Sequence, residues 1–394
     1  MTLAGKAGPL LLVSLCFAGL AANVSGRALE PLVTIISAEF AIGVSVTALL
    51  TTAYALPFAL GQPILGPIGD LYGKIRLLRI SLWALTAALL LSALAPTFET
   101  LAIARFLAGL AAGGVVPSCM ATIGDSYPPE RRQVAISMFV TMGLLAQIFA
   151  TSASGLIGEA FGWRVVLITS AFFGLLGALA ATFGLKAQRR DADVEFSVDA
   201  AAENYRSVFR NPKAVLCYAT VFLEGVALFG ILPYIGSILS AQGEGGAAEA
   251  GIVIGAMGVG GLVYIFLVAA LLRRFNRRHF MAVGGLIMTC GPLALAAAAP
   301  WQACAVAFAV TGLGFMLLHN SMQTEAVDLA PGARQSAYSL HAFSFFSGQA
   351  AGPPIFAGLL ALLGSNAALT ASAVALALTG VIIAMLFARL ERPA

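Results

Sequence analysis

Apolar stretches of about 20 residues or more follow one another along nearly the whole chain. A helix that crosses about 30 Å of hydrocarbon needs about 20 such residues, because each residue adds only 1.5 Å of rise. With about 33 residues for each helix and its loop, the 394 residues hold about twelve such helices and little else. The apolar runs are continuous and do not alternate with period two, which excludes a porin-like barrel. The sequence therefore predicts an all-α membrane protein.

The charge content supports this prediction. Only 10% of the residues are charged, whereas soluble domains carry about 25%. The mean hydropathy is +0.93, so most side chains must face lipid or one another. No room is left for a large soluble domain.

The apolar runs predict twelve transmembrane helices. Their approximate ranges are 9–36, 45–68, 77–97, 101–124, 134–158, 164–185, 213–239, 250–272, 280–299, 302–325, 336–360 and 366–388. Because similar apolar runs follow the first one, we interpret 9–36 as a span and not as a cleaved leader. The five cysteines lie inside apolar runs without a CxxC pair, so we expect packing residues and neither a metal site nor a cofactor.

One long polar interval, Lys186–Pro212, divides the chain into two sets of six spans. We predict an N-terminal bundle at 1–185, a cytoplasmic linker at 186–212 and a C-terminal bundle at 213–394. Of the 22 basic residues, 19 fall on the side that holds this interval and both termini, and the other three are Arg27, Arg105 and Arg164. Loops rich in Lys and Arg stay cytoplasmic. We therefore expect a multi-pass protein of the inner cell membrane with cytoplasmic termini. The net charge of +4 reflects this asymmetry and calls for no nucleic-acid partner.

The two halves repeat each other at an offset of 203 residues. At this offset Gly109 aligns with Gly312, Ser118 with Ser321, Asp125 with Asp328, Pro128 with Pro331, and Arg131 with Arg334. The segment Asp70–Lys74 aligns in the same way with Arg273–Arg277. Two pseudo-symmetric six-helix bundles produce such a repeat, and molecules built in this way hold their substrate between the halves near the membrane midplane.

The loop between the second and third spans has a distinctive sequence. It reads Gly66-Pro-Ile-Gly-Asp70-Leu-Tyr-Gly73-Lys74-Ile-Arg76, with Gly73 placed for a tight turn into the basic run. This string resembles the G-x-x-x-D-[RK]-x-G-[RK] loop of the major facilitator superfamily, although Leu71 replaces the usual cation. The resemblance implies the major facilitator fold and a conformational-switch role for the loop. A plain positive-inside loop is the alternative. The second set of switch candidates, in cytoplasmic networks after the fourth and tenth spans, is Asp125, Arg131, Asp328 and Arg334.

Two further elements bear on the type of transporter. The fourth span contains Arg105-Phe-Leu-Ala-Gly109, which resembles a motif of the twelve-span drug/proton antiporters. An arginine in a span usually faces the bundle interior, although Arg105 could instead reach the membrane surface. The antiporter Gly-Pro element of the fifth span is absent, and the eleventh span instead has Gly352-Pro353-Pro354.

Two acidic residues are candidates for proton coupling. Glu224 lies near the middle of the seventh span with no basic residue within a turn, and desolvation there favours the neutral acid. Glu30 lies three residues after Arg27 on one face of the long first span. Either residue could exchange a proton, and exchange at Glu30 would free Arg27 to hold an anionic or polar group. The alternative for Arg27 and Glu30 is a static pair near the outer end of the first span, and the alternative for Glu224 is a neutral acid that is permanently hydrogen-bonded to a neighbouring helix.

Other polar side chains within the spans are candidates for the substrate cavity. Together with Arg27 and Arg105 they are Asn23, Gln147, Tyr234, His319, Gln323 and His341. A lone histidine among apolar residues is more often a packing residue, and helices that are apolar on all sides give no periodicity that shows which face lines a pathway.

These observations predict a proton-coupled exporter of small, partly hydrophobic molecules that works as a monomer in the lipid bilayer. A proton symporter or facilitator that imports a small metabolite is the first alternative, and a membrane receptor without transport is another. We do not expect an enzyme, because HExxH, GxSxG and the P-loop motif are absent and all four lysines lie in loops or at helix ends.

Overall fold

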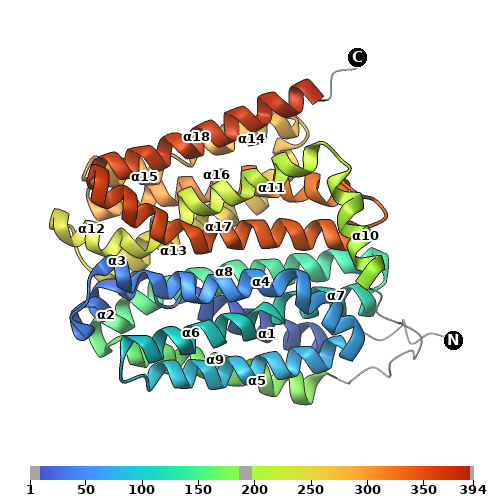
Figure 1. The fold of residues 1–394 in the computed structure, drawn as a ribbon, viewed down its shortest axis with the longest axis horizontal. Coiled ribbons are helices and arrows are strands. Elements are labelled where there is room, and N and C mark those ends of the chain that lie inside the picture. Colours follow the sequence, from blue (N-terminus) through green and yellow to red (C-terminus); the bar gives the residue numbers. More distant parts are fainter. Residues whose placement is uncertain (1–8, 186–197, 391–394) are drawn as a thin grey trace.

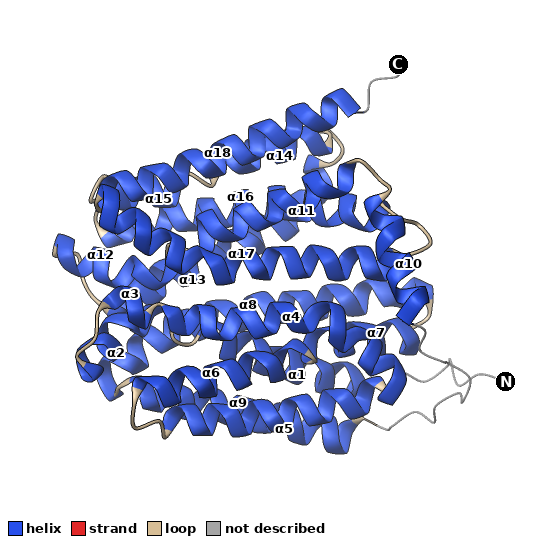
Figure 2. Ribbon diagram, viewed as in Figure 1, coloured by secondary structure: helices blue, strands red, loops and turns tan. Residues whose placement is uncertain are grey.

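A computed structural model describes residues 9–185 and 198–390 of the chain. Within these ranges all regular secondary structure is helical (Figure 2). Twelve helical segments are long and apolar enough to cross a membrane, which confirms the predicted number, and their ends differ by a few residues from the predicted ones. Numbered as spans 1 to 12, they are Leu10–Phe40, Val44–Leu65, Lys74–Ala93, Phe98–Ser126, Val134–Phe161, Trp163–Gly184, Lys213–Gln242, Ala247–Leu271, Arg277–Ala296, Trp301–Asp328, Arg334–Leu363 and Ser365–Leu390.

Several spans are built from more than one helical element. The elements are α1 (Pro9–Arg27), η1 (Glu30–Leu32), α2 (Val33–Phe40), α3 (Val44–Thr47), α4 (Leu49–Tyr72), α5 (Lys74–Ala93), α6 (Phe98–Gly113), α7 (Val115–Ser126), α8 (Pro129–Phe161), α9 (Trp163–Gly184), α10 (Val198–Phe209), α11 (Lys213–Glu224), η2 (Gly225–Phe229), η3 (Leu232–Tyr234), α12 (Ile235–Gln242), α13 (Ala247–Leu271), α14 (Arg277–Ile287), α15 (Cys290–Ala296), α16 (Trp301–Asp328), α17 (Arg334–Leu363) and α18 (Ser365–Leu390).

The spans form two bundles that lie side by side. In Figure 1 the elements α1 to α9 occupy the lower half of the molecule and α11 to α18 the upper half, and α10 runs along one end between them. The halves meet along two helix pairs, α4 with α17 and α8 with α13. This arrangement confirms the predicted fold of two six-helix bundles.

The repeat between the halves extends to individual backbone contacts. Gly109 packs so closely on α4 that an added Cβ would lie 2.0 Å from the carbonyl oxygen of Tyr54. In the other half an added Cβ on Gly312 would lie 1.9 Å from the carbonyl oxygen of Met257. Both pairs are related by the offset of 203 residues. Small residues let membrane helices approach in this way, so the aligned glycines serve the same packing role in each half.

Spans 1 and 7 are both interrupted. Span 1 changes from α1 to the 3₁₀ helix η1 just before Pro31, and span 7 continues after Glu224 as the π-helix η2 and then the 3₁₀ helix η3 around Pro233. Proline and π-helical turns are common causes of such breaks. Because η1 and η3 pack against each other, the break in span 1 places Glu30 at the boundary between the halves.

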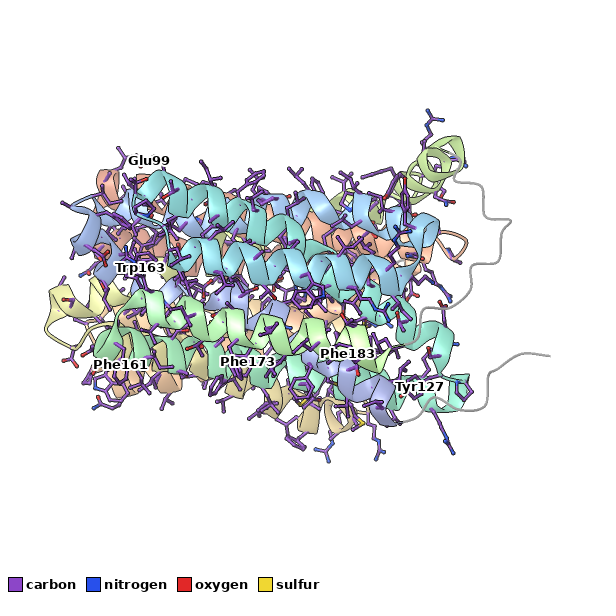
Figure 3. The ribbon with its side chains drawn as sticks, turned by 90° about the horizontal axis from the view of Figure 1, so that it is seen from below. Glu99, Tyr127, Phe161, Trp163, Phe173 and Phe183 are labelled. Atoms are coloured by element: carbon purple, nitrogen blue, oxygen red, sulfur yellow. The ribbon has the colours of Figure 1, made fainter. Side chains whose placement is uncertain are left out.

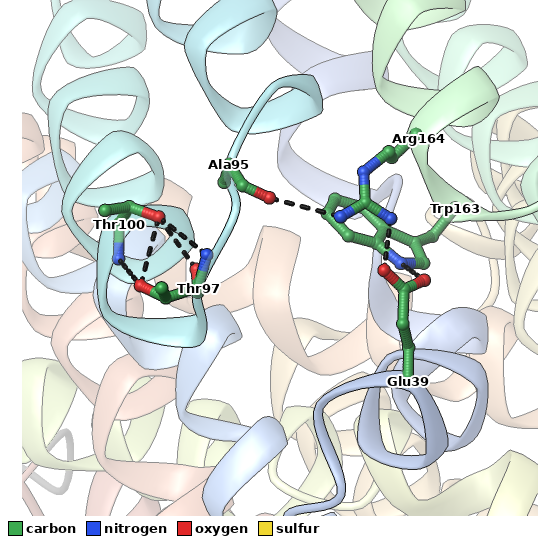
Figure 4. Close-up of polar contacts among 6 residues, drawn as sticks. All are labelled: Glu39, Ala95, Thr97, Thr100, Trp163 and Arg164. Carbon is green, nitrogen blue, oxygen red and sulfur yellow. Dashed lines mark hydrogen bonds and ion pairs between the residues drawn. The ribbon is translucent and has the colours of Figure 1, made fainter.

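A polar contact connects spans 1 and 6 with the loop after span 3, at the end of the N-terminal half where span 1 finishes. The carboxylate of Glu39 accepts a hydrogen bond of 2.7 Å from Trp163 Nε1 and pairs with the Arg164 guanidinium, which also donates to the carbonyl of Ala95 (Figure 4). Figure 3 shows that Trp163 lies at the opposite end of the molecule from Tyr127. Arg164, one of the three basic residues that do not fall on the basic side, therefore connects the end of span 1 and the start of span 6 to the loop after span 3.

Candidate functional site

The first polar cluster lies where α1 ends. Arg27 Nη1 donates to Glu30 Oε1 at 2.6 Å, and Glu30 is only 2% exposed. The other carboxylate oxygen of Glu30 has no hydrogen-bond partner among the described residues. A buried carboxylate depends on pairing with a cation, so Arg27 and Glu30 act as a unit.

Arg27 also contacts the other half of the molecule. Its Nη2 donates to Gln349 Oε1 of α17 at 3.2 Å, and its Cζ lies 4.5 Å from the centre of the Phe229 ring in η2. A guanidinium over an aromatic face is an attractive arrangement. The Arg27 side chain therefore joins span 1 to spans 7 and 11 across the boundary between the halves.

Arg105 is fully inside the N-terminal half. It is 1% exposed, donates from Nη1 to the Ser25 carbonyl at 3.0 Å, and lies 4.4 Å from the centre of the Tyr54 ring. The hydroxyls of Ser25 and Tyr54 share a hydrogen bond of 2.8 Å. Arg105 is therefore bound to span 1 next to the first polar cluster, and its buried side chain does not extend to the membrane surface.

The second polar cluster belongs to the C-terminal half. Glu224, at the end of α11, is 0% exposed, and its Oε2 lies 2.8 Å from Nδ1 of His319 on α16. Its Oε1 has no partner in the described part of the chain. The rings of His319 and His341 are 5.0 Å apart, and neither ring nitrogen of His341 bonds to a described residue. The structure thus brings together three of the sequence-predicted candidates from three spans.

Aromatic rings connect the two clusters. Phe315 and Phe345 lie 4.8 Å and 4.4 Å from the His319 ring, and Phe345 is 5.3 Å from Phe229, which contacts Arg27. Phe346 extends the series to Phe58 of α4 at 4.5 Å. We call Phe58, Phe229, Phe315, Phe345 and Phe346 the aromatic cluster. It presents a largely apolar surface between the polar groups of the two halves.

Four other cavity candidates do not join these clusters through a described contact. Asn23, Gln147 and Gln323 are half-buried, and the Asn23 side chain donates to the carbonyl of Gly19 within its own helix at 2.8 Å. Tyr234 is 1% exposed, and its hydroxyl donates to the carbonyl of Pro353 at 3.0 Å. The position of Tyr234 between spans 7 and 11 is therefore one of helix packing.

The end of the molecule that carries α10 holds matching ion pairs in the two halves. Lys74 Nζ lies 2.7 Å from Asp125 Oδ2, and Arg277 Nη1 lies 3.6 Å from Asp328 Oδ2. These two pairs are again related by the offset of 203 residues. Glu325 strengthens the second site, with its carboxylate 2.9 Å from Arg277.

The remaining switch candidates are a glycine in a turn, three exposed arginines, and Gly66 and Asp70 of α4. Gly73 has a φ of 95° and forms the turn between α4 and α5, a conformation that suits glycine. Arg76, Arg131 and Arg334 are exposed. Gly66 and Asp70 lie near the end of α4, and the Asp70 side chain is not among those that the structure describes.

Several site residues were not singled out from the sequence, among them the rings of the aromatic cluster, Gln349 and Arg277. Gln349 and Phe229 have no charge or motif that marks them, and only the fold brings them to Arg27. Arg277 carries a usable signal, because it aligns with Lys74 at the 203-residue offset in the same way that Asp328 aligns with Asp125. Across the described residues, no group of three His, Cys, Asp or Glu side chains is placed to hold a metal ion.

A sequence comparison matches nearly the whole chain to one protein family. The profile of the Major Facilitator Superfamily matches residues 13–353 and 245–394. An uncharacterized MFS-type transporter of Bacillus subtilis, YwfA, is 28% identical over 257 residues, which cover 64% of this chain and 62% of YwfA. The citrinin biosynthesis cluster MFS transporter mrr1 of Monascus ruber is 30% identical over 150 residues, which cover 37% of this chain and 30% of mrr1. In both cases the matched region spans less than two thirds of the relative's length. The relatives are transporters by name and not enzymes.

Solved structures share the fold at low sequence identity. A peptide transporter, POT, has a TM-score of 0.79 with 16% identity, over 97% of this chain and 95% of that chain. A bacterial homolog of the human lysosomal transporter Spinster, in an inward-facing conformation, has a TM-score of 0.72 with 15% identity, over 98% and 96% of the two chains.

Proposed function

This chain belongs to the Major Facilitator Superfamily, and we propose from this premise that it is a secondary transporter of a small molecule. Its two bundles would expose a shared central site alternately to the two sides of the membrane. The proposal is supported by the polar clusters and the aromatic cluster, which meet where spans 1, 7 and 11 of the two halves approach each other.

We propose that transport is coupled to protons through Glu224, and one observation carries this step. The Glu224 carboxyl group is 0% exposed, has one oxygen at 2.8 Å from a histidine nitrogen and leaves the other without a described partner. A charge at such a place is costly, so gain or loss of a proton there changes the free energy of a conformation by a large amount. Glu30, held by Arg27, is the second coupling candidate.

Export of small, partly hydrophobic molecules is the direction that we propose first. The aromatic cluster offers rings on which an apolar molecule can pack, and the Arg105 segment resembles that of proton-driven exporters. Proton symport into the cell is the second candidate. The observation in its favour is the Arg27–Glu30 pair, because protonation of Glu30 would free the guanidinium for a polar substrate in the same step.

The remaining parts of the proposal concern the surroundings of the site. We propose that Lys74, Arg76, Asp125, Arg131, Asp328 and Arg334, with Gly66, Asp70 and Gly73, form the conformational switch on the cytoplasmic side. We further propose the boundaries 1–185, 186–212 and 213–394 for the bundles and linker, cytoplasmic termini, and a monomer in the bilayer of the inner cell membrane. These proposals are supported by the distribution of the basic residues, most of which fall on the side that holds the polar interval 186–212 and both termini.

A flux assay tests both coupling and direction. Purified full-length protein is reconstituted into liposomes, an acidic interior is imposed, and uptake of ethidium into the lumen is followed by fluorescence. We expect uptake that depends on the pH gradient and disappears when nigericin collapses the gradient. Protein-free liposomes correct for passive entry. Export coupled to protons is contradicted if ethidium uptake is the same with and without the gradient, and symport is supported if the opposite gradient drives the uptake.

A further inference from the structure

Three titratable side chains of the C-terminal half lie at increasing depth from the end of the molecule that carries α10. With 1.5 Å of rise per residue, His341 lies about 10 Å from the start of α17, His319 about 14 Å from the end of α16, and Glu224 about 16 Å from the start of α11. These helix ends lie together, because Lys213 and Glu325 form an ion pair at 3.7 Å and α17 follows α16 after a short loop. We call Glu224, His319 and His341 the acid–histidine row.

Each member of the row is close to the next. Oε2 of Glu224 lies 2.8 Å from Nδ1 of His319, and the ring centres of His319 and His341 are 5.0 Å apart. The ring centre of Tyr338, which lies nearer to the start of α17, is 6.3 Å from that of His341, and Tyr338 is 37% exposed. Since Glu224 is 0% and His341 2% exposed, the row leads from a buried acid toward an exposed phenol.

Polar atoms of the row remain for a small bound molecule. Oε1 of Glu224 and both ring nitrogens of His341 are buried and bond to no described residue. Buried polar groups without a protein partner are commonly hydrogen-bonded to internal water. Water also suits the gap between the rings of His319 and His341, because one molecule can accept a hydrogen bond from one imidazole and donate to the other.

Apolar surroundings separate the row from the first polar cluster. The ring of Phe345 lies 4.4 Å from that of His319 and 5.3 Å from that of Phe229, which contacts Arg27. Beyond Glu224, in the direction away from α10, the element η2 has the sequence Gly-Val-Ala-Leu-Phe and no titratable side chain. Among the described contacts, the titratable groups that lead away from Glu224 are therefore the two histidines.

Other titratable groups near the row are either occupied or lie at the α10 end. Glu224 and Tyr338 are the titratable groups with a described contact to one of the two imidazoles. Tyr218 of α11 also packs on α17, and its hydroxyl donates to the carbonyl of Ala337 at 3.1 Å. The other charged side chains of α11, α14, α16 and α17 lie at or near the α10 end, among them Lys213, Arg277, Glu325, Asp328 and Arg334.

We propose that His319 and His341 carry protons between Glu224 and the α10 end of the molecule, with a bound water as the link between the two imidazoles. Protonated Glu224 gives its proton from Oε2 to Nδ1 of His319, and His319 gives the proton of its other ring nitrogen to the water. The water passes a proton to one ring nitrogen of His341, and His341 releases the proton of its other nitrogen to water beside Tyr338. Each imidazole changes tautomer and keeps its number of protons, and Glu224 becomes a carboxylate. The inference rests on the proposed proton coupling through Glu224 and adds the route and the end of the molecule to which it leads.

Two kinds of ethidium flux test the role of His341. Uptake into liposomes driven by a pH gradient needs net proton transfer, whereas counterflow of ethidium at equal pH on both sides needs only exchange of one substrate molecule for another. We expect His341→Gln, which cannot shuttle a proton, to lower gradient-driven uptake about tenfold or more and to leave counterflow intact. His279→Gln is the matched control, since His279 is exposed at the start of α14, and we expect it to leave both fluxes unchanged.

Infrared difference spectroscopy tests the same step without a transported substrate. In detergent, the carboxyl band of protonated Glu224, identified by its absence in Glu224→Gln, is followed after a rapid step to alkaline pH. We expect its decay to slow about tenfold in His341→Gln and in His341→Ala. Added imidazole should restore the rate in His341→Ala, because the truncated side chain leaves space for it, and His279→Gln should decay at the unaltered rate.

The outcomes separate the proton route from the proposed function. If the unaltered protein moves no ethidium in either pH gradient, proton-coupled ethidium transport fails, and the infrared rates alone decide the route. Equal decay of the Glu224 band in His341→Gln and His279→Gln overturns the inference, whatever the fluxes are. Loss of counterflow together with gradient-driven uptake, at an unaltered infrared rate, shows that His341 has only a structural role and also overturns it. If no Glu224 band is present at any pH, both the route and coupling through Glu224 are wrong.

Discussion

Glu224 and His319 form a buried acid–imidazole pair, with 2.8 Å between Oε2 and Nδ1, that connects span 7 to span 10. The π-helix η2 begins at the next residue, Gly225. A π-helical turn inside an α-helix frequently marks a functional position. The protonation state of this pair is therefore placed to influence the shape of span 7, which carries Phe229 to Arg27 of the other half.

Replacement of Glu224 by glutamine should separate binding from proton coupling. Gln keeps the size of the side chain but cannot lose or gain a proton. We expect Glu224→Gln to abolish the part of ethidium flux that depends on the pH gradient, while thermal stabilisation by added ethidium persists. Glu203→Gln is the matched control, since Glu203 lies exposed on α10. If Glu224→Gln couples as well as the control variant, Glu224 is not the proton carrier.

Loss of His319 should destabilise the protein. In His319→Leu the Glu224 carboxyl group, with no other described hydrogen-bond partner, is left buried and unpaired, which costs about 1–3 kcal/mol. We expect a lower melting temperature in detergent than for His279→Leu, because His279 is exposed at the start of α14. Equal melting temperatures for the two variants would show that His319 does not hold the acid in place.

The sequence was sufficient to predict the architecture of this chain. Twelve spans followed from the lengths of the apolar runs, because the thickness of the bilayer sets the length of a helix. The repeat at 203 residues predicted two related bundles, and Gly109 and Gly312 show why, since both allow the same backbone contact. The boundaries were less predictable, because α4 continues to Tyr72 and α8 begins at Pro129, where polar residues extend a helix beyond the apolar run.

The site could be predicted only in part. An acid inside a span, such as Glu224, attracts attention by its cost, but its partner His319 lies 95 residues away and only the packing of α11 on α16 brings them together. Gln349 and Thr52 are ordinary polar residues whose contacts depend on which helices meet at the boundary between the halves. Helices that are apolar on all sides give no periodicity from which that boundary could be inferred.

A charge exchange should test the matching ion pairs near α10. Lys74 and Asp125 are 28% and 46% exposed, and pairs of this kind contribute about 0–1 kcal/mol to stability. We therefore expect Asp125→Lys to change the melting temperature little but to slow ethidium flux several-fold, because it places two cations together. Lys74→Asp combined with Asp125→Lys should restore the flux. Failure of the double variant to recover, or an equal effect of Arg131→Glu, would argue that the pair has no switch role.

Removal of Glu39 should weaken the connection between spans 1 and 6. The carboxylate accepts from Trp163 and pairs with Arg164 (Figure 4). Since the Glu39 side chain is 41% exposed, solvent reduces the contribution, and we expect Glu39→Ala to cost about 1 kcal/mol. Glu39→Gln keeps an acceptor for Trp163 but loses the charge, so its melting temperature should lie between those of Glu39→Ala and the unaltered protein. An effect of Glu39→Gln as large as that of Glu39→Ala would assign the stabilisation to the ion pair alone.

A single methyl group where α8 meets α13 should show how closely these two helices are packed. In Gly251→Ala the new Cβ would lie 2.5 Å from the Thr151 carbonyl oxygen, so the two helices must move apart, at a cost of about 1–3 kcal/mol for overpacking. We expect a lower melting temperature together with slower ethidium flux. Gly358→Ala is the matched control, because an added Cβ there meets no atom within 4 Å and alanine favours a helix by about 1 kcal/mol over glycine. Its melting temperature should be unchanged or higher. If Gly251→Ala behaves like Gly358→Ala, the contact between α8 and α13 has room to adjust and does not depend on close backbone packing.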